Sequence, residues 1–302
     1  MTAEKYTFPV TDGGFDAVFR EYCAIFEKQL RTVCDSFCDN GAKYRALYDA
    51  ASYSLEAGGK RIRPVLAFEM CRVCGGDIND AVPAAVAVEM IHTFSLIHDD
   101  LPCMDDDDMR RGRPSCHKAH GEAVALLAGD ALSAYAGKYI CDSDFPAEKK
   151  TAMIKELYDR TLGMIEGQTI DTDGKFDTLD GLLSMYEMKT SELLTAASVM
   201  GCIAAGADEE KISAARAYAH DVGLAFQIVD DILDVTSTVE ELGKPIGSDA
   251  QQEKTTSVTL LGLDKARELA KKYTEGAENA LSAFENNEFL CRLTDLLLNR
   301  KN

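Results

Sequence analysis

The sequence predicts an all-α protein that folds as one domain. Apolar residues recur at helical spacing in most segments, as in residues 14–38, where Phe19, Phe26 and Leu30 follow it. No segment shows the period-two alternation of a half-buried strand. The chain has 302 residues, 46% of them hydrophobic, and no Ser/Gly-rich or Pro-rich linker. We therefore expect a single domain over residues 1–302.

The expected helices are separated by short turn and loop signals. They cover residues 14–38, 42–56, 62–74, 80–98, 119–141, 147–170, 179–205, 209–236, 257–281 and 285–298. Pro102, Pro114 and Pro146 lie at breaks between them, because proline is poorly tolerated inside a helix. The segment 242–249 is the clearest loop, with two glycines and Pro245.

The composition of single helices indicates how they pack. Residues 80–98 are strongly apolar, and residues 119–141 are rich in small residues that permit close approach. The polar run 166–171 lies at a helix end that should be buried. Lys189 and Thr190 precede a long apolar run, so they face either solvent or the cleft.

The charge and cysteine content restrict the function and the compartment. A formal charge of −19 argues against nucleic acid and against an anionic membrane surface as partners. No run of 18 or more apolar residues is apparent, so no membrane span is expected. The ten cysteines include only an isolated Cys71-x-x-Cys74 pair, which predicts reduced thiols rather than a zinc site. Without a visible signal peptide, we expect a cytoplasmic protein.

A dense acidic cluster follows the apolar segment 84–97. Six carboxylates occupy ten positions from Asp99 to Asp108, and Arg110, Arg111 and Arg113 follow at once. A solvated acidic loop is the plain alternative for such a run. The buried helix before it favours a site instead, because adjacent negative charges repel each other unless cations or solvent stabilise them.

A second acidic motif lies far along the chain, at Asp230, Asp231 and Asp234. At ~100° per residue its three carboxylates fall within about a 100° arc of one helix face. Two carboxylate clusters facing each other across a cleft would suit Mg²⁺ that bridges to a diphosphate. In the first cluster an ideal helix pairs Asp99 with Asp106, whereas Asp105 needs a distortion at Pro102, so periodicity leaves both open.

A basic segment, Gly58-Gly59-Lys60-Arg61-Ile62-Arg63-Pro64, precedes the acidic cluster by one helix. Its glycines let the backbone turn, and the cations at the start of a helix suit an anion. An ordinary turn with solvated Lys and Arg is the alternative. Beside a carboxylate cluster, we interpret the segment as a phosphate cradle with Lys60 and Arg63 as clamps. His92 and His98 lie on an apolar helix and, taken alone, are core residues.

Together these motifs resemble the trans-prenyltransferases, the short-chain isoprenyl diphosphate synthases, and especially the bacterial farnesyl diphosphate synthases. Five motifs occur in order: Gly-Gly-Lys-Arg-Ile-Arg-Pro, Asp-Asp-x-x-x-x-Asp before Arg-Arg-Gly, Lys-Thr, Phe-Gln-x-x-Asp-Asp-x-x-Asp and Gly-Lys-x-x-Gly-x-Asp. The resemblance covers essentially the whole chain. It implies the all-α isoprenoid-synthase bundle, a single polyprenyl synthetase domain and usually a homodimer.

The resemblance also implies roles for individual residues. Metal binding falls to Asp99, Asp100, Asp105, Asp230, Asp231 and Asp234. An isopentenyl diphosphate pocket is implied at Gly59, Lys60, Arg63, His92 and Arg111. Contacts with the allylic diphosphate are implied at Arg110, Lys189, Lys244 and Lys254. Thr190 and Gln227 would lie along the carbocation, and Phe226 would bind substrate. Glu253 stands where the family often has glycine before the lysine, which weakens the assignment of Lys254.

The implied reaction condenses isopentenyl diphosphate with dimethylallyl or geranyl diphosphate to give farnesyl diphosphate. Three Mg²⁺ ions per active site, or Mn²⁺ in their place, would stabilise the leaving diphosphate, and the cation would need a dry apolar pocket. Phe94 and Ser95 lie below the first motif, where an aromatic ring would stop the growing chain.

Other interpretations remain open from the sequence. A geranylgeranyl diphosphate synthase shares every motif, including the two extra residues of the first. A terpene cyclase would share the ionisation step without needing a second diphosphate pocket. An HD-type phosphohydrolase would use His92 and His98-Asp99 but leaves the second motif unexplained. A non-catalytic relative should have lost one acidic motif, and both are present.

Overall fold

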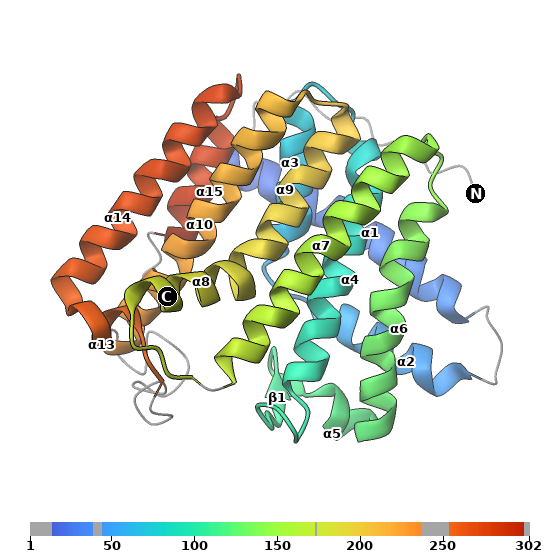
Figure 1. The fold of residues 1–302 in the computed structure, drawn as a ribbon. Coiled ribbons are helices and arrows are strands. Elements are labelled where there is room, and N and C mark those ends of the chain that lie inside the picture. The colour runs from blue at the N-terminus through green and yellow to red at the C-terminus, as the bar shows by residue number, and fades with distance from the viewer. Residues whose placement is uncertain (1–13, 39–43, 173, 237–253, 299–302) are drawn as a thin grey trace.

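The computed structural model describes residues 14–38, 44–172, 174–236 and 254–298 and is almost entirely helical, as predicted (Figure 1). The helices of the first half are α1 (Gly14–Cys38), α2 (Arg45–Leu55), α3 (Ile62–Val73), the 3₁₀ turn η2 (Ile78–Ala81), α4 (Val82–Asp99), α5 (Cys116–His120), α6 (Glu122–Cys141) and α7 (Ala147–Asp171). Those of the second half are α8 (Leu179–Tyr186), the π turn η3 (Glu187–Ser191), α9 (Glu192–Ala205), α10 (Glu209–Thr236), α13 (Ser257–Leu261), α14 (Leu263–Ala280), the 3₁₀ turn η4 (Leu281–Ala283) and α15 (Glu288–Leu298).

Two predicted helices are interrupted, and in each case the interruption is local. The helix expected over 257–281 breaks at Gly262, which adopts φ +80°, a conformation that residues with a side chain rarely adopt. The one expected over 179–205 contains the π turn η3. Insertions of this kind are frequent at functional sites, and η3 carries Lys189 and Thr190.

A short antiparallel hairpin was not expected. In the described part of the chain, strands β1 (Met109–Arg110) and β2 (Arg113–Pro114) pair directly after the acidic cluster. The loop between them is Arg111 and Gly112, with φ of +53° and +76°. Positive φ at both central residues is typical of the two-residue hairpin turn whose backbone twist matches the twist of the two strands. Strands of two residues are too short to show an alternating pattern, which is why the sequence did not reveal them.

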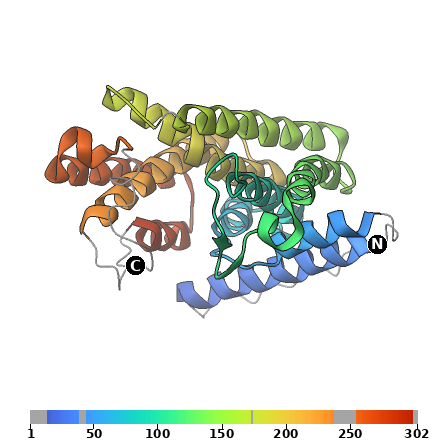
Figure 2. The same ribbon diagram turned by 90° about the horizontal axis from the view of Figure 1, so that it is seen from below.

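The core lies between α3, α4 and α9. Figure 2 shows α3 and α4 between α1 on one side and α7 on the other. Residues from Ala84 to Ile91 are buried without interruption, so α4 is enclosed on all sides. A smaller apolar cluster joins α8, α10 and α14 around Leu182, Leu224 and Ala266. Because α10 contributes to both clusters, the terminal helices are anchored to the rest of the bundle.

No membrane span was expected, and one helical segment of the described residues nevertheless passes a test of length and composition. The segment Ile78–Asp99 is long and apolar enough, by length and composition, to cross a membrane. In the fold, 67% of its most apolar window is buried against other helices. An enclosed core helix carries few charges for the same reason a spanning helix does, so the apolar composition of α4 is accounted for by packing.

Candidate active site

The first acidic motif lies where α4 ends. Asp99 is the last residue of the helix, and the chain then turns so that the backbone N–H of Asp105 donates to the carbonyl oxygen of Asp99 at 2.9 Å. This return brings Asp105 close enough to raise the pKa of Asp99 by charge repulsion. Asp106, with φ +51°, instead faces His117. The structure therefore places Asp105, rather than Asp106, beside Asp99.

The carboxylates of this motif are partly withdrawn from water. Burial raises the pKa of Asp99 to about 6, while Lys189 opposes the shift and Asp105 adds to it. Burial also raises the pKa of Asp100, although Arg110 counteracts it. Desolvated carboxylates held close together favour a bound cation, because a cation removes both the repulsion and the loss of solvation.

The hairpin presents Arg110 to this motif. Its Nε donates to Asp100 at 2.9 Å, its Nη2 contacts the same oxygen, and Nη2 also lies 3.0 Å from Asp107. Burial, the largest single effect, lowers the pKa of Arg110, but its hydrogen bond to Asp100 and the nearby carboxylates together outweigh burial, so the pKa is raised. Tyr53 fixes the hairpin, since its hydroxyl donates to the carbonyl oxygen of Pro114 at 2.8 Å.

The basic segment separates into structural and site-facing cations. Arg61 is 3% exposed, and its guanidinium donates to Glu27 and Glu89, each at 2.7 Å, and to a carbonyl oxygen of α2. It therefore anchors the segment to the core. Gly59 allows the approach of Arg111, because a Cβ there would lie 2.7 Å from the guanidinium carbon. Arg111 also contacts the carbonyl oxygen of Gly58.

Arg63 and His92 lie side by side in the lining of the cavity, and Arg63 supplies its positive charge. The Nε of Arg63 is buried and has no hydrogen-bond partner among the described residues. Burial lowers the pKa of Arg63 to about 10; the charge of Glu89 raises this pKa, and the charge of Arg111 lowers it further. Burial and the nearby arginines hold the pKa of His92 well below its usual value. Cations that repel each other around an unsatisfied N–H suit an anion. Lys60 lies exposed near the start of this segment.

The π turn η3 is held tightly between α7 and α10. A Cβ added at Gly167 of α7 would lie 2.6 Å from the backbone nitrogen of Lys189. A Cβ added at Gly223 of α10 would lie 2.7 Å from the Cα of Ser191. Within η3 the hydroxyl of Thr190 donates to Oε1 of Gln227 on α10 at 3.1 Å. The two glycines thus let η3 bring its lysine and threonine to the cavity.

Asp171 is a residue that the sequence did not single out for a role. Its Oδ2 lies 2.5 Å from the ammonium of Lys189 and 3.6 Å from that of Lys254. The structure therefore brings Lys254 beside Lys189, although Glu253 precedes it. The available signal was a carboxylate at the predicted buried end of a helix, four residues after Gly167. Lys244 lies outside the described residues.

The second acidic motif is carried by the last turns of α10. Asp231 is 6% exposed, and its Oδ2 accepts from the Tyr186 hydroxyl at 2.7 Å and from the backbone N–H and the hydroxyl of Ser257 at 2.7 and 2.6 Å. Asp234 is buried, and Asp230 is partly exposed one turn from Gln227. Phe226 packs against the main core.

A cavity of about 460 Å³ lies between α3, α4, α7, η3 and α9, and none of Arg110, Asp171, Asp230, Asp231 and Asp234 is among the residues that line it. Its polar end holds Arg63, His92, Asp99, Gln168, Lys189 and Thr190, and its walls include Phe94, Ser95, Met164, Ile165 and Leu193. The Phe94 ring meets the His98 ring edge-on at 5.1 Å. The Ser95 hydroxyl donates to the His92 carbonyl oxygen at 2.9 Å. Charged groups at one end and an apolar interior suit a molecule with an anionic head and a hydrocarbon tail.

The family model described as polyprenyl synthetase matches residues 44–287, a range that contains both acidic motifs and the basic segment. The chain belongs to the polyprenyl synthetase family. A geranylgeranyl diphosphate synthase of Cyanophora paradoxa is 44% identical over 264 residues, covering 85% of this chain and 88% of that one. A crystal structure of geranylgeranyl pyrophosphate synthetase from Pyrococcus horikoshii matches with a TM-score of 0.83 and 30% identity, covering 93% of this chain and 99% of that one. A geranyltransferase structure from Legionella pneumophila matches with a TM-score of 0.82 and 32% identity, covering 94% and 97%.

These matches confirm the predicted all-α prenyltransferase fold and the prenyltransferase activity of this polyprenyl synthetase. They do not confirm that farnesyl diphosphate synthases are its nearest kin, because the curated relatives are mainly named as geranylgeranyl synthases. The Asp-rich cluster that follows α4 lies within the range that this family model matches, which is consistent with a divalent metal.

Proposed function

We propose that this polyprenyl synthetase joins isopentenyl diphosphate head-to-tail to allylic diphosphates and releases geranylgeranyl diphosphate. The observation that carries the elongation step is the cavity itself. One end combines the desolvated carboxylate of Asp99 with a guanidinium nitrogen of Arg63 that has no hydrogen-bond partner among the described residues, and the interior is apolar. Such an end can hold two diphosphates, one against carboxylate-bound cations and one against arginine.

The donor set fits Mg²⁺. Carboxylate oxygens are its preferred protein ligands, and burial makes those of Asp99 and Asp100 unfavourable without a cation. The residues that would hold the ions are Asp99, Asp100, Asp105, Asp230, Asp231 and Asp234. When bound, Mg²⁺ neutralises charge that develops on the departing diphosphate. Asp231 is already oriented by Tyr186 and Ser257, which limits the motion of this second motif.

The protein's own cations divide into two groups. Lys189 and Lys254, held together by Asp171, lie on the allylic side, and Arg110 reaches it through Asp100. Arg63, His92, Arg111, Gly59 and Lys60 belong to the side that would bind isopentenyl diphosphate. A neutral His92 can donate or accept one hydrogen bond without adding charge to a site already crowded with arginines.

Thr190 and Gln227 supply polar oxygen atoms that carry no charge. The Thr190 hydroxyl, which donates to Oε1 of Gln227, lies on the cavity wall. Dipoles of this kind stabilise a carbocation without capturing it, provided that water is excluded. Met164, Ile165 and Leu193 supply the apolar walls that exclude water.

A C20 product is supported by the names of the curated relatives, which are mainly geranylgeranyl synthases. A second candidate, a C15 product, is favoured by one observation. Phe94 lies on the cavity wall, 9% exposed, with its ring braced against His98. Its position below Asp99 would shorten the space for a growing chain.

The test is a product assay. The purified full chain is incubated with Mg²⁺, labelled isopentenyl diphosphate and, in separate reactions, dimethylallyl, geranyl or farnesyl diphosphate, and products are separated by length. Accumulation at C20 from all three primers supports the proposal. Accumulation at C15, with farnesyl diphosphate not extended, would favour the second candidate and retain the mechanism. Allylic primer consumed without isopentenyl incorporation would contradict both.

We also propose that the protein acts as a cytoplasmic homodimer. The neighbouring helices α6 and α7 expose Leu126, Leu127 and Leu162, whose side chains are 45%, 56% and 57% accessible. Exposed apolar side chains on adjacent helices favour an interface. Light scattering at micromolar protein should give twice the monomer mass of 32.9 kDa. A monomer that Leu127→Glu leaves unchanged would refute the interface.

A further inference from the structure

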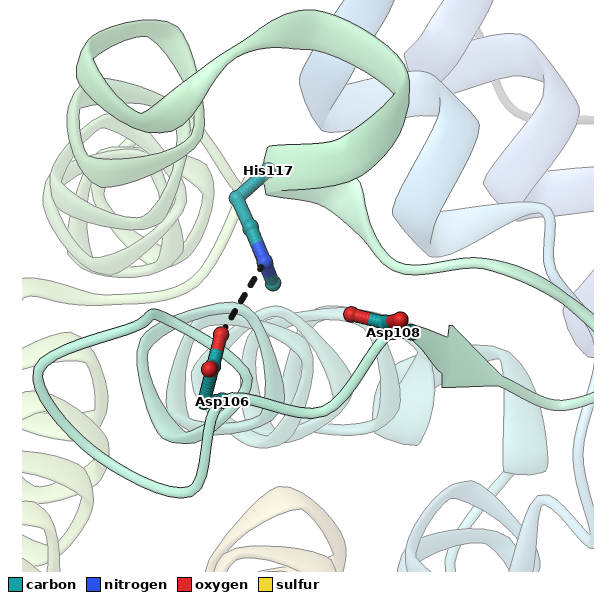
Figure 3. Close-up of side chains that lie close together, drawn as sticks. All are labelled: Asp106, Asp108 and His117. Atoms are coloured by element: carbon teal, nitrogen blue, oxygen red, sulfur yellow. Dashed lines mark ion pairs between the residues drawn. The ribbon is translucent and has the colours of Figure 1, made fainter.

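A second cluster of ligand-type side chains lies beside the catalytic motif but faces away from its cavity. It consists of Asp106 and Asp108, in the loop after α4, and His117 in α5 (Figure 3). One imidazole nitrogen and one carboxylate oxygen from each aspartate all lie within 4.8 Å of one another. None of the three lines the large cavity.

The decisive observation is His117. Its side chain is 2% exposed, and its Nε2 is buried with no hydrogen-bond partner in the described part of the chain. Figure 3 shows the ring pointing from α5 toward the two carboxylates, and Nε2 lies 4.0 Å from Oδ1 of Asp106. That distance is too long for a hydrogen bond. A buried ring nitrogen without a partner is costly unless something else satisfies it.

The other ring nitrogen is already oriented. Nδ1 of His117 lies 3.1 Å from the hydroxyl oxygen of Ser115, which is itself 1% exposed. A ring that donates from Nδ1 leaves the lone pair of Nε2 directed at the carboxylates. This is the arrangement found around metal-bound histidines, where a second partner fixes the tautomer.

We propose that Asp106, Asp108 and His117 form a divalent-cation site separate from the catalytic carboxylates. A set of one imidazole and two carboxylates favours a transition cation of the Zn²⁺ class over Mg²⁺, which prefers oxygen alone. Bonds of ~2.0–2.2 Å would require the ligand atoms to close by roughly 1 Å. Asp106 and Asp108 can supply this motion, because their side chains are 61% and 74% exposed.

Lys118 acts as a competitor for this site. Its ammonium lies 2.7 Å from Asp108 and 4.0 Å from Asp106, so it partly neutralises the two carboxylates. A cation must displace it, and Lys118 is 42% exposed and free to swing into solvent. Once bound, the cation would tie the loop that carries Asp105 to α5, and so would stabilise the backbone return to Asp99.

The experiment measures binding of Co²⁺ alone, by visible absorption and equilibrium dialysis, to the full chain. The background is Asp99→Asn/Asp230→Asn, which removes one carboxylate from each catalytic motif. We expect one ion per chain with an imidazole-type spectrum. Asp106→Asn/Asp108→Asn should weaken binding by at least about tenfold. Asp107→Asn, which removes the same charge from the same loop but lies outside the cluster, should change it less than about threefold.

Two further variants guard the interpretation. Lys118→Met should tighten Co²⁺ binding several-fold, because the competing ammonium is gone. His117→Gln should abolish the imidazole spectrum. If this buried substitution unfolds the chain, the Co²⁺ affinity of Asp106→Asn/Asp108→Asn, whose side chains are exposed, still tests the site. Binding that is absent, that is unchanged by Asp106→Asn/Asp108→Asn, or that is equally lost in Asp107→Asn would overturn the proposal. Because the background is catalytically disabled, the outcome is independent of the prenyl-transfer assay.

Discussion

Replacing Gly167 by alanine should damage the active site without touching any charged group. The new Cβ would lie 2.6 Å from the backbone nitrogen of Lys189 and 2.7 Å from the Cβ of Met188. Carbon contacts normally begin near 3.5 Å, so η3 must move away from α7 by roughly 1 Å. The neighbours are largely backbone, which cannot rotate aside.

Two opposing effects set the size of the change. Alanine is favoured over glycine inside a helix by about 1 kcal/mol. Overpacking a rigid contact costs about 1–3 kcal/mol, and a backbone contact this short belongs at the upper end. We therefore expect a net destabilisation of about 1–2 kcal/mol, or a few degrees in Tm. A shift of about 1 Å in Lys189 should lower kcat by up to 10²-fold.

The matched control is Gly163→Ala, one turn earlier in α7. A Cβ there would meet only the flexible Glu192 side chain, at 3.1 Å. This variant should keep wild-type kcat and equal or exceed wild-type stability. The measurements are thermal unfolding and steady-state isopentenyl transfer at saturating Mg²⁺. If Gly167→Ala matches Gly163→Ala in both Tm and kcat, then the close approach of α7 does not position η3.

Three other perturbations test separate parts of the site. Asp171→Asn removes the carboxylate shared by two lysine ammonium groups and should lower kcat/KM for the allylic diphosphate by roughly tenfold or more. The surface variant Asp159→Asn should leave kcat/KM unchanged. Equal kinetics in the two variants would refute a role of Asp171 in positioning the lysines. Phe94→Ala should lengthen the main product by at least one isoprene unit in chromatography, and an unchanged length would place the floor elsewhere. The hydrogen bond to Asp221 raises the pKa of His220, although burial opposes it, so the stability it provides is complete below about pH 6.5 and is lost as pH rises through the raised pKa. The difference in unfolding free energy between wild type and His220→Gln, on the order of 0.5 kcal/mol for this half-exposed pair, should shrink between pH 6 and 8; a difference that grows with pH would contradict this.

The helices and the acidic motifs could be read from the sequence because their signals are local. Apolar periodicity located α4 and α10, and the motifs at their ends followed directly. The choice between Asp105 and Asp106 could not be made that way. It depends on a single backbone hydrogen bond from Asp105 to Asp99 and on a positive φ at Asp106. Neither feature produces a periodic pattern in the sequence.

Features that depend on long-range contacts could not be predicted from the sequence, because their signals are not local. Asp171 pairs with Lys189 and Lys254, which lie 18 and 83 residues further along the chain. No rule of sequence spacing predicts these pairs. The π turn η3 depends on glycines in two other helices. The hairpin that orients Arg110 was too short to be recognised. The motif gave Arg61 no role, and only the structure shows that its ion pairs with Glu27 and Glu89 direct it into the core.

The most direct measurement is Mg²⁺-dependent incorporation of isopentenyl diphosphate by the wild type and by Asp230→Ala. The account predicts turnover that chelator abolishes and that falls by about 10²-fold or more in Asp230→Ala at saturating Mg²⁺. Rates within a few-fold of wild type in that variant, or transfer that continues in chelator, would contradict metal binding by both carboxylate motifs.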